Sequence, residues 1–130
     1  MPTDAALRLE VGRFRRGEHR RRFPTRLSLG ELAGDRTSVE VPAEVDLQLG
    51  TDLALALAER TPADLWGHLV WWVTRPGVPD LHEMDNRWIA ATAQAAGVLG
   101  LDRLPIYVIT RTGWLDPVGG NSRRWVRLRL

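Results

Sequence analysis

Apolar and polar residues alternate over much of the first half of the chain, and this period of two predicts half-buried β-strands. Over 7–16, Leu7, Leu9 and Val11 point one way while charged residues point the other. A second strand over 20–29 would return beside it, forming an N-terminal hairpin. The same alternation predicts two more strands, at 37–41 and 44–49.

Helical signals dominate the middle of the chain. Ala and Leu residues over 53–60 favour a helix that Thr51 or Asp52 can cap. Thr61 and Pro62 suit the start of a second helix over 62–74, which is apolar on nearly all sides. A third helix begins near residue 80 with capping residues. Its apolar stripe recurs at a helical step: Leu81, Met84, Trp88, Ala91, Ala95 and Val98.

Strand patterns return near the C-terminus. Residues 105–112 are β-branched and mostly apolar, which predicts a central strand, and 124–130 alternate again after a turn-rich segment. The order strands, helices, strands predicts an α+β fold with a mostly antiparallel sheet packed on about three central helices. We expect one domain over 1–130. Its parts are β-rich 1–50, helical 51–100 and a β-hairpin over 104–130.

Composition excludes several chemistries. The 130 residues contain no Cys and no Lys, so all 18 basic residues are Arg. Thiolate nucleophiles, Cys-ligated metal sites, Schiff-base lysines and P-loop lysines are therefore excluded. Arg in place of Lys is typical of a GC-rich bacterial genome, so the number of Arg residues alone is weak evidence of function. We expect no cofactor.

Targeting and membrane signals are missing from the sequence. The first twenty residues lack the apolar stretch of a secretory signal. The longest apolar runs are far shorter than the ~18 residues that a membrane span needs. A cytoplasmic protein without membrane contact is expected.

The charges are unevenly distributed along the chain, although the formal net charge is only +2. Residues 1–30 hold eight Arg and three acidic residues, 31–102 hold four and twelve, and 103–130 hold six and one. Clustered guanidinium groups bind phosphates, and aromatic rings beside them can stack on bases. The leading hypothesis is a non-catalytic protein that contacts nucleic acid or another polyanion through the N-terminal hairpin and the C-terminal strand. The candidate residues are Arg13, Arg15, Arg16, Arg20, Arg21, Arg22, Arg26, Arg124, Trp125, Arg127 and Arg129.

The tryptophans suggest an alternative function. Six Trp in 130 residues is high, and three of them fall within the expected helix 62–74. Trp71 and Trp72 differ by about 100° in direction on a helix, so one of them could leave the core. Since Trp and Arg are enriched at binding hot spots, this helix could join a protein partner or a second copy of the chain. A Trp-rich core explains the same residues.

A third hypothesis is a small hydrolase. His82 and Asp85 share a face of the expected helix, but the sequence around them lacks the second His of a zinc-hydrolase motif. Capping of the helix by acidic residues explains the pair equally well. We therefore assign no catalytic residue and no metal ligand, and expect the protein not to be an enzyme.

Overall fold

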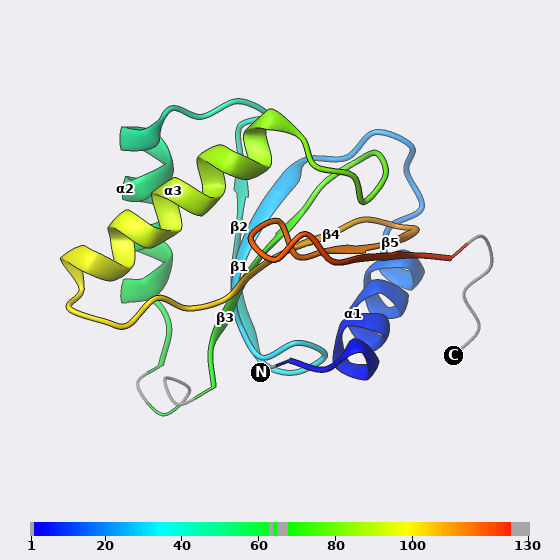
Figure 1. Cartoon of the computed structure of the whole chain (residues 1–130), viewed down its shortest axis with the longest axis horizontal. Helices are drawn as coiled ribbons and strands as arrows, with labels where there is room; N and C mark the ends of the chain where they lie inside the picture. The colour runs from blue at the N-terminus through cyan, green and yellow to red at the C-terminus, as the bar shows by residue number, and fades with distance from the viewer. Residues whose placement is uncertain (1, 63, 65–67, 126–130) are drawn as a thin grey trace.

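The computed structural model describes residues 2–62, 64 and 68–125, and within them the fold is α+β, with three helices and one six-stranded sheet (Figure 1). The elements in chain order are α1 (Asp4–Gly17), β1 (Thr25–Gly30), β2 (Arg36–Val41), α2 (Leu47–Glu59), β3 (Val70–Thr74), α3 (Glu83–Val98), β4 (Ile106–Ile109), β5 (Gly113–Leu115) and β6 (Ser122–Arg124).

The sheet has the strand order β2-β1-β3-β4-β5-β6. It is mixed, because β3 and β4 run parallel while the other neighbouring strands run antiparallel. A parallel pair needs a long crossover connection, and α3 provides it between β3 and β4. The expectation of a mostly antiparallel sheet missed this parallel pair at its centre.

The N-terminal hairpin prediction was wrong, because residues 4–17 form α1. Thr3 caps this helix by accepting a hydrogen bond from the backbone N–H of Ala6 at 3.2 Å. The buried Leu7 and Val11 are four residues apart, a helical spacing that the alternation over 7–16 also contains. Leu9, expected on the same side, is 51% exposed. Only the second half of the expected strand 20–29 pairs in the sheet, as β1.

The strand predicted at 37–41 is confirmed as β2, but 44–49 is not a strand. Asp46 accepts a hydrogen bond from the backbone N–H of Leu49 at 2.8 Å and so begins α2. This cap starts the helix earlier than the sequence pattern indicated, and α2 continues through the expected helical residues.

The helix predicted over 62–74 was wrong in its described part, where 70–74 form β3. This strand lies inside the sheet and is covered on both faces, and strands of that kind are apolar on all sides like a buried helix. Its five residues are all buried. Residues 63 and 65–67, which include Trp66, lie outside the described residues.

The predictions for the chain after residue 80 were more accurate. The third helix is confirmed as α3, and the central strand within 105–112 is confirmed as β4. Two short strands, β5 and β6, follow where one long turn and one strand were expected. Residues 126–130, on which the expected alternation depended, lie outside the described residues.

The helices cover the two faces of the sheet unequally. α2 and α3 lie on one face, and α1 lies on the other (Figure 1). Six strands about 4.8 Å apart make a sheet about 24 Å wide, whereas one helix with its side chains is about 10–12 Å across. Two helices can cover such a face, but a single helix leaves roughly half of it open. The open part lies over β1 and β2.

Candidate functional site

A pocket of about 490 Å³ occupies the part of the α1 face that α1 leaves open. It lies between the second half of α1 and the strands β1, β2 and β3. Charged and hydroxyl side chains predominate in its lining, which consists of Glu10, Arg13, Phe14, Gly17, Glu18, Arg20, Arg26, Ser28, Arg36, Ser38, Trp72 and Thr74.

The strand residues of the pocket share one face because of their register. Ser28 stands opposite Ser38 on one side and opposite Trp72 on the other. The Ser28 and Ser38 hydroxyl oxygens are 2.7 Å apart and form a hydrogen bond. Two residue pairs further along the ladder, Arg26 stands opposite Thr74. Alternation along each strand therefore sends these polar side chains to the pocket and their neighbours to the opposite core.

A buried ion pair forms one wall of the pocket. Arg36 donates two hydrogen bonds of 2.7 Å to the two carboxylate oxygens of Glu10, which is 1% exposed. The same guanidinium lies 4.7 Å from the centre of the Trp72 ring, in cation–π geometry. Glu10 also accepts a hydrogen bond from the backbone N–H of Ala33 at 2.8 Å. This pair ties α1 to the β1–β2 turn.

Three more arginines, from three different segments, line the pocket. Arg13 on α1 donates one hydrogen bond to the carbonyl of Gly34, and Arg26 on β1 donates one to the carboxylate of Glu40. Arg20, between α1 and β1, donates two hydrogen bonds to Glu18 at 3.0 and 2.7 Å. Since a guanidinium has five N–H donors, all three keep unused donors.

The hydrogen bonds from Arg20 also change the acidity of its partner. They are the main reason why the pKa of Glu18 falls from 4.5 to about 2. Glu18 therefore remains ionised at neutral pH. With four Arg and two Glu among its lining residues, the pocket has a formal charge of +2.

One polar atom at the pocket has no partner. The indole Nε1 of Trp72 is buried and makes no hydrogen bond, although Trp72 lines the pocket. Buried donors without partners are uncommon in proteins, and each one requires an explanation. Trp71 also has an unpartnered Nε1, and both rings pack in apolar clusters, Trp71 on the α2 and α3 side of the sheet and Trp72 on the α1 side.

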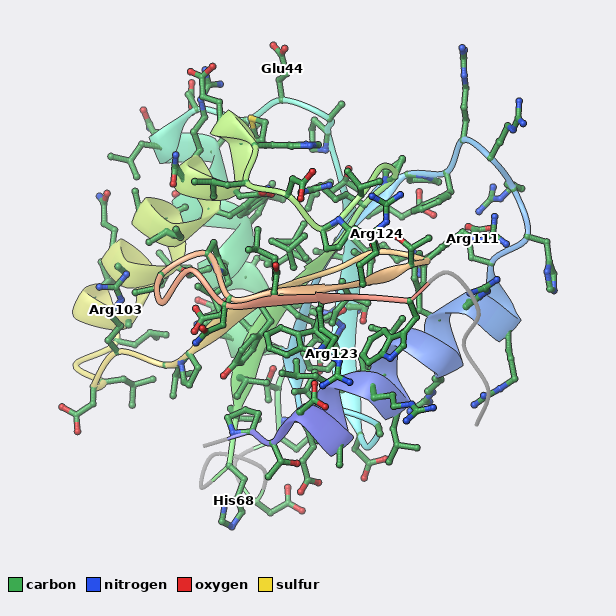
Figure 2. The ribbon with its side chains drawn as sticks, turned by 45° about the vertical axis from the view of Figure 1, so that its right-hand side comes forward. Glu44, His68, Arg103, Arg111, Arg123 and Arg124 are labelled. Atoms are coloured by element: carbon green, nitrogen blue, oxygen red, sulfur yellow. The ribbon has the colours of Figure 1, made fainter. Side chains whose placement is uncertain are left out.

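The other predicted N-terminal arginines do not line this pocket, although each lies within two residues of one that does. Arg16, Arg21 and Arg22 are exposed and have no ion-pair partner within the described residues. Arg15 is half-buried, and its Nη1 has no hydrogen-bond partner. In Figure 2, long side chains with nitrogen tips extend into solvent from the light-blue segment between α1 and β1. The arginines thus cluster around a helix end and a connection, not on a hairpin.

The predicted C-terminal residues are arranged differently. Trp125 lies between two arginines, with the Arg8 and Arg123 guanidinium carbons 5.8 and 5.5 Å from its ring centre. Arg123 points toward α1, where it pairs with Asp4 at 3.4 Å, while Arg124 extends from the opposite side of β6 (Figure 2). Neither Trp125 nor Arg124 lines the pocket. Arg127 and Arg129 lie outside the described residues.

Trp71 and Trp72 do not lie on a surface that a partner could reach. They are 1% and 0% exposed, because β3 lies inside the sheet and its two faces are both covered. The exposed helix on which the interface hypothesis relied is not formed by 70–74.

His82 and Asp85 have structural roles at the start of α3. Asp85 is buried and accepts hydrogen bonds from Arg75 at 3.0 and 2.9 Å and from the backbone N–H of His82 at 2.8 Å. A carboxylate engaged in this way is not available as a general base. Within the described residues, no group of three or more His, Asp or Glu side chains could hold a metal ion.

Comparisons with known proteins found no matching protein family, no similar curated protein and no similar solved structure. Among the described residues, no helix has both the length and the apolar character needed to cross a bilayer.

Sequence reasoning missed several residues of the pocket. It identified Arg13, Arg20 and Arg26, but not Arg36 or the paired serines. A signal was present: Arg26 and Ser28 on one strand, and Arg36 and Ser38 on the next, are each two residues apart. This period places each pair on one face, and antiparallel pairing of the two strands brings the pairs together.

Proposed function

We propose that this is a non-catalytic protein that binds nucleic acid through the arginine-rich end of α1. The surface consists of Arg13, Arg16, Arg20, Arg21, Arg22 and Arg26, and we call it the arginine surface. The proposal rests on the exposure of Arg16, Arg21 and Arg22 and on their lack of ion-pair partners. All three are exposed, lie within two residues of pocket-lining residues in the sequence, and have no ion-pair partner within the described residues.

The expected mechanism is electrostatic positioning of the phosphate backbone. Each phosphate that an arginine neutralises releases counterions from the nucleic acid, so the affinity falls as salt rises. The proposal differs from the sequence-based hypothesis in one respect. It uses the N-terminal arginines alone, because Arg123 and Trp125 contact each other and α1, and Arg124 lies on the other side of β6.

Binding of labelled single- and double-stranded oligonucleotides, measured by fluorescence anisotropy at several salt concentrations, tests this proposal. We expect binding that weakens with salt. Replacing both Arg21 and Arg22 with Ala should reduce the slope of log affinity against log salt by about one for each lost phosphate contact.

The matched control is the double substitution of Arg60→Ala and Arg103→Ala. Arg60 follows α2, and Arg103 lies on the side of the molecule away from Arg111 and Arg124 (Figure 2). This control removes the same charge and should leave the slope unchanged. Failure to bind any oligonucleotide at low salt, or an equal loss in both double variants, would overturn the proposal.

A further inference from the structure

We infer that the pocket beside the arginine surface binds a phosphomonoester dianion, such as the terminal phosphate of a nucleic acid strand. This inference rests on the proposed function for the source of the ligand, but the pocket chemistry can be tested separately. The inference concerns the twelve lining residues, whereas the observation behind the proposed function is the exposure of Arg16, Arg21 and Arg22, which do not line the pocket.

Charge balance favours a monoester over other phosphate groups. The pocket has a formal charge of +2, and a phosphomonoester carries about −1.5 to −2 at pH 7. A phosphodiester within a strand carries only −1, as does a carboxylate. The monoester is therefore the group that best neutralises the pocket.

The donors of the pocket come from several segments of the chain. Arg13, Arg20 and Arg26 come from α1, the following connection and β1, and each keeps unused N–H donors. Between Ser28 and Ser38, one hydroxyl hydrogen is used in their mutual bond and the other is left for a ligand. A tetrahedral phosphate has three oxygens that can accept from these donors at once.

Trp72 holds one of the pocket arginines in place, because the Arg36 guanidinium lies in cation–π geometry over its ring. Trp72 is 0% exposed, lines the pocket and carries the Arg36 guanidinium over its ring. The rest of this wall is well satisfied, because Glu10 and Arg36 pair with each other. Arg36 is therefore fixed in the wall, and the guanidinium N–H groups left for a ligand are those of Arg13, Arg20 and Arg26.

The test compares ligands that differ in one phosphate. Oligonucleotides of one sequence with a 5′-phosphate or a 5′-hydroxyl are measured by anisotropy. Adenosine monophosphate, inorganic phosphate, adenosine and acetate are titrated by NMR while the Trp72 indole and the arginine Nε–H signals are observed. We expect the 5′-phosphate to strengthen binding about tenfold, the effect of one or two charge-assisted hydrogen bonds. The monophosphate and inorganic phosphate should shift the pocket signals to saturation, and adenosine and acetate should not.

Two substitutions make a matched pair. Arg26→Gln and Glu40→Gln both break the same exposed ion pair, so any effect of that pair on the fold is common to both. Arg26 lines the pocket and Glu40 does not. Arg26→Gln should abolish most of the preference for the 5′-phosphate, and Glu40→Gln should preserve it.

The outcomes separate this inference from the proposed function. Equal affinity for both oligonucleotides, together with no saturable shift from inorganic phosphate, overturns the pocket inference and leaves salt-dependent nucleic acid binding intact. Saturable phosphate binding without binding to any oligonucleotide supports the pocket and overturns the proposed function. Equal effects of Arg26→Gln and Glu40→Gln also contradict the assignment of the pocket.

Discussion

The two faces of the sheet are covered by helices to different extents, and β3 contributes a buried tryptophan to each face. Trp71 points into the apolar core under α2 and α3, where it packs with residues such as Leu27 and Leu57. Its neighbour Trp72 points to the α1 face, where a smaller core adjoins a charged pocket. The first face is closed by two helices and the second is partly covered by one. The first face thus has the larger buried apolar cluster, whereas part of the second face remains an open pocket.

Each region also contains a buried ion pair, and the two pairs differ in how fully they are satisfied. Arg75 uses all five of its N–H donors, on Asp85 and on the carbonyls of Pro76, Val78 and Asp80. Arg36 borders the pocket, and its side chain is 19% exposed against 7% for Arg75. A buried ion left without its partner is costly, and the cost falls when water can reach it.

The largest effects are expected from breaking these pairs. Asp85→Ala should lower the free energy of unfolding by about 3–5 kcal/mol, because it leaves the Arg75 guanidinium buried without a counter-ion. Glu10→Ala should cost less, about 1–3 kcal/mol, because the pocket admits water to Arg36. Chemical denaturation of the two variants measures the difference.

Glu83→Ala is the control for this experiment. Glu83 pairs with Arg87 at 3.4 Å on the exposed surface of α3, and its side chain is 84% exposed. Its loss should change the stability by about 0.5 kcal/mol or less. If Glu10→Ala proves as costly as Asp85→Ala, the two regions do not differ in the way we describe.

A smaller difference in stability is expected between alanine substitutions at two glycines, one in α2 and one in α1. A Cβ at Gly50 in α2 would lie 2.9 Å from the Cβ of Ala91 in α3, so Gly50→Ala forces the closely packed helices apart. Overpacking of this kind costs about 1–3 kcal/mol. Gly17, the last residue of α1, has nothing within 4 Å of the same position. Gly17→Ala should be neutral or stabilise by up to about 0.5 kcal/mol. Thermal unfolding measures both, and a neutral Gly50→Ala contradicts the tight packing.

Local signals in the sequence predicted α3, β2 and β4 correctly, because each has one periodicity and clear boundaries. They failed where one pattern fits two structures. Leu7 and Val11 fit both a strand and a helix, and only the cap at Thr3 and the packing on the sheet favour α1. The apolar segment of β3 was read as a helix because it is covered on both faces, and that depends on the tertiary fold.

The candidate site was predictable only in part for a related reason. Clustering along the chain identified Arg13, Arg20 and Arg26, which are near one another in sequence. The pocket also needs Arg36 from β2 and Trp72 from β3, and strand pairing brings these to the same place. Seven of the predicted arginines and Trp125 do not line it or lie outside the described residues. Charge clustering thus indicated the region, while the sheet register determines which arginines share the pocket.

The smallest expected effect concerns pH and the pocket face alone. Glu18 has a folded-state pKa of about 2 instead of 4.5, mainly because Arg20 donates hydrogen bonds to it. Its ionised form therefore stabilises the folded state above about pH 4.5, and this contribution is lost as the pH falls toward 2. Arg20→Ala should raise the Glu18 pKa toward 4.5, which NMR titration of the Glu18 carboxyl measures directly. The variant should be less stable than the original protein above pH 4.5 and equal to it below pH 2, with Arg21→Ala as the unchanged control. A Glu18 that titrates near 4.5 in the unaltered protein would show that Arg20 is not held against it in solution.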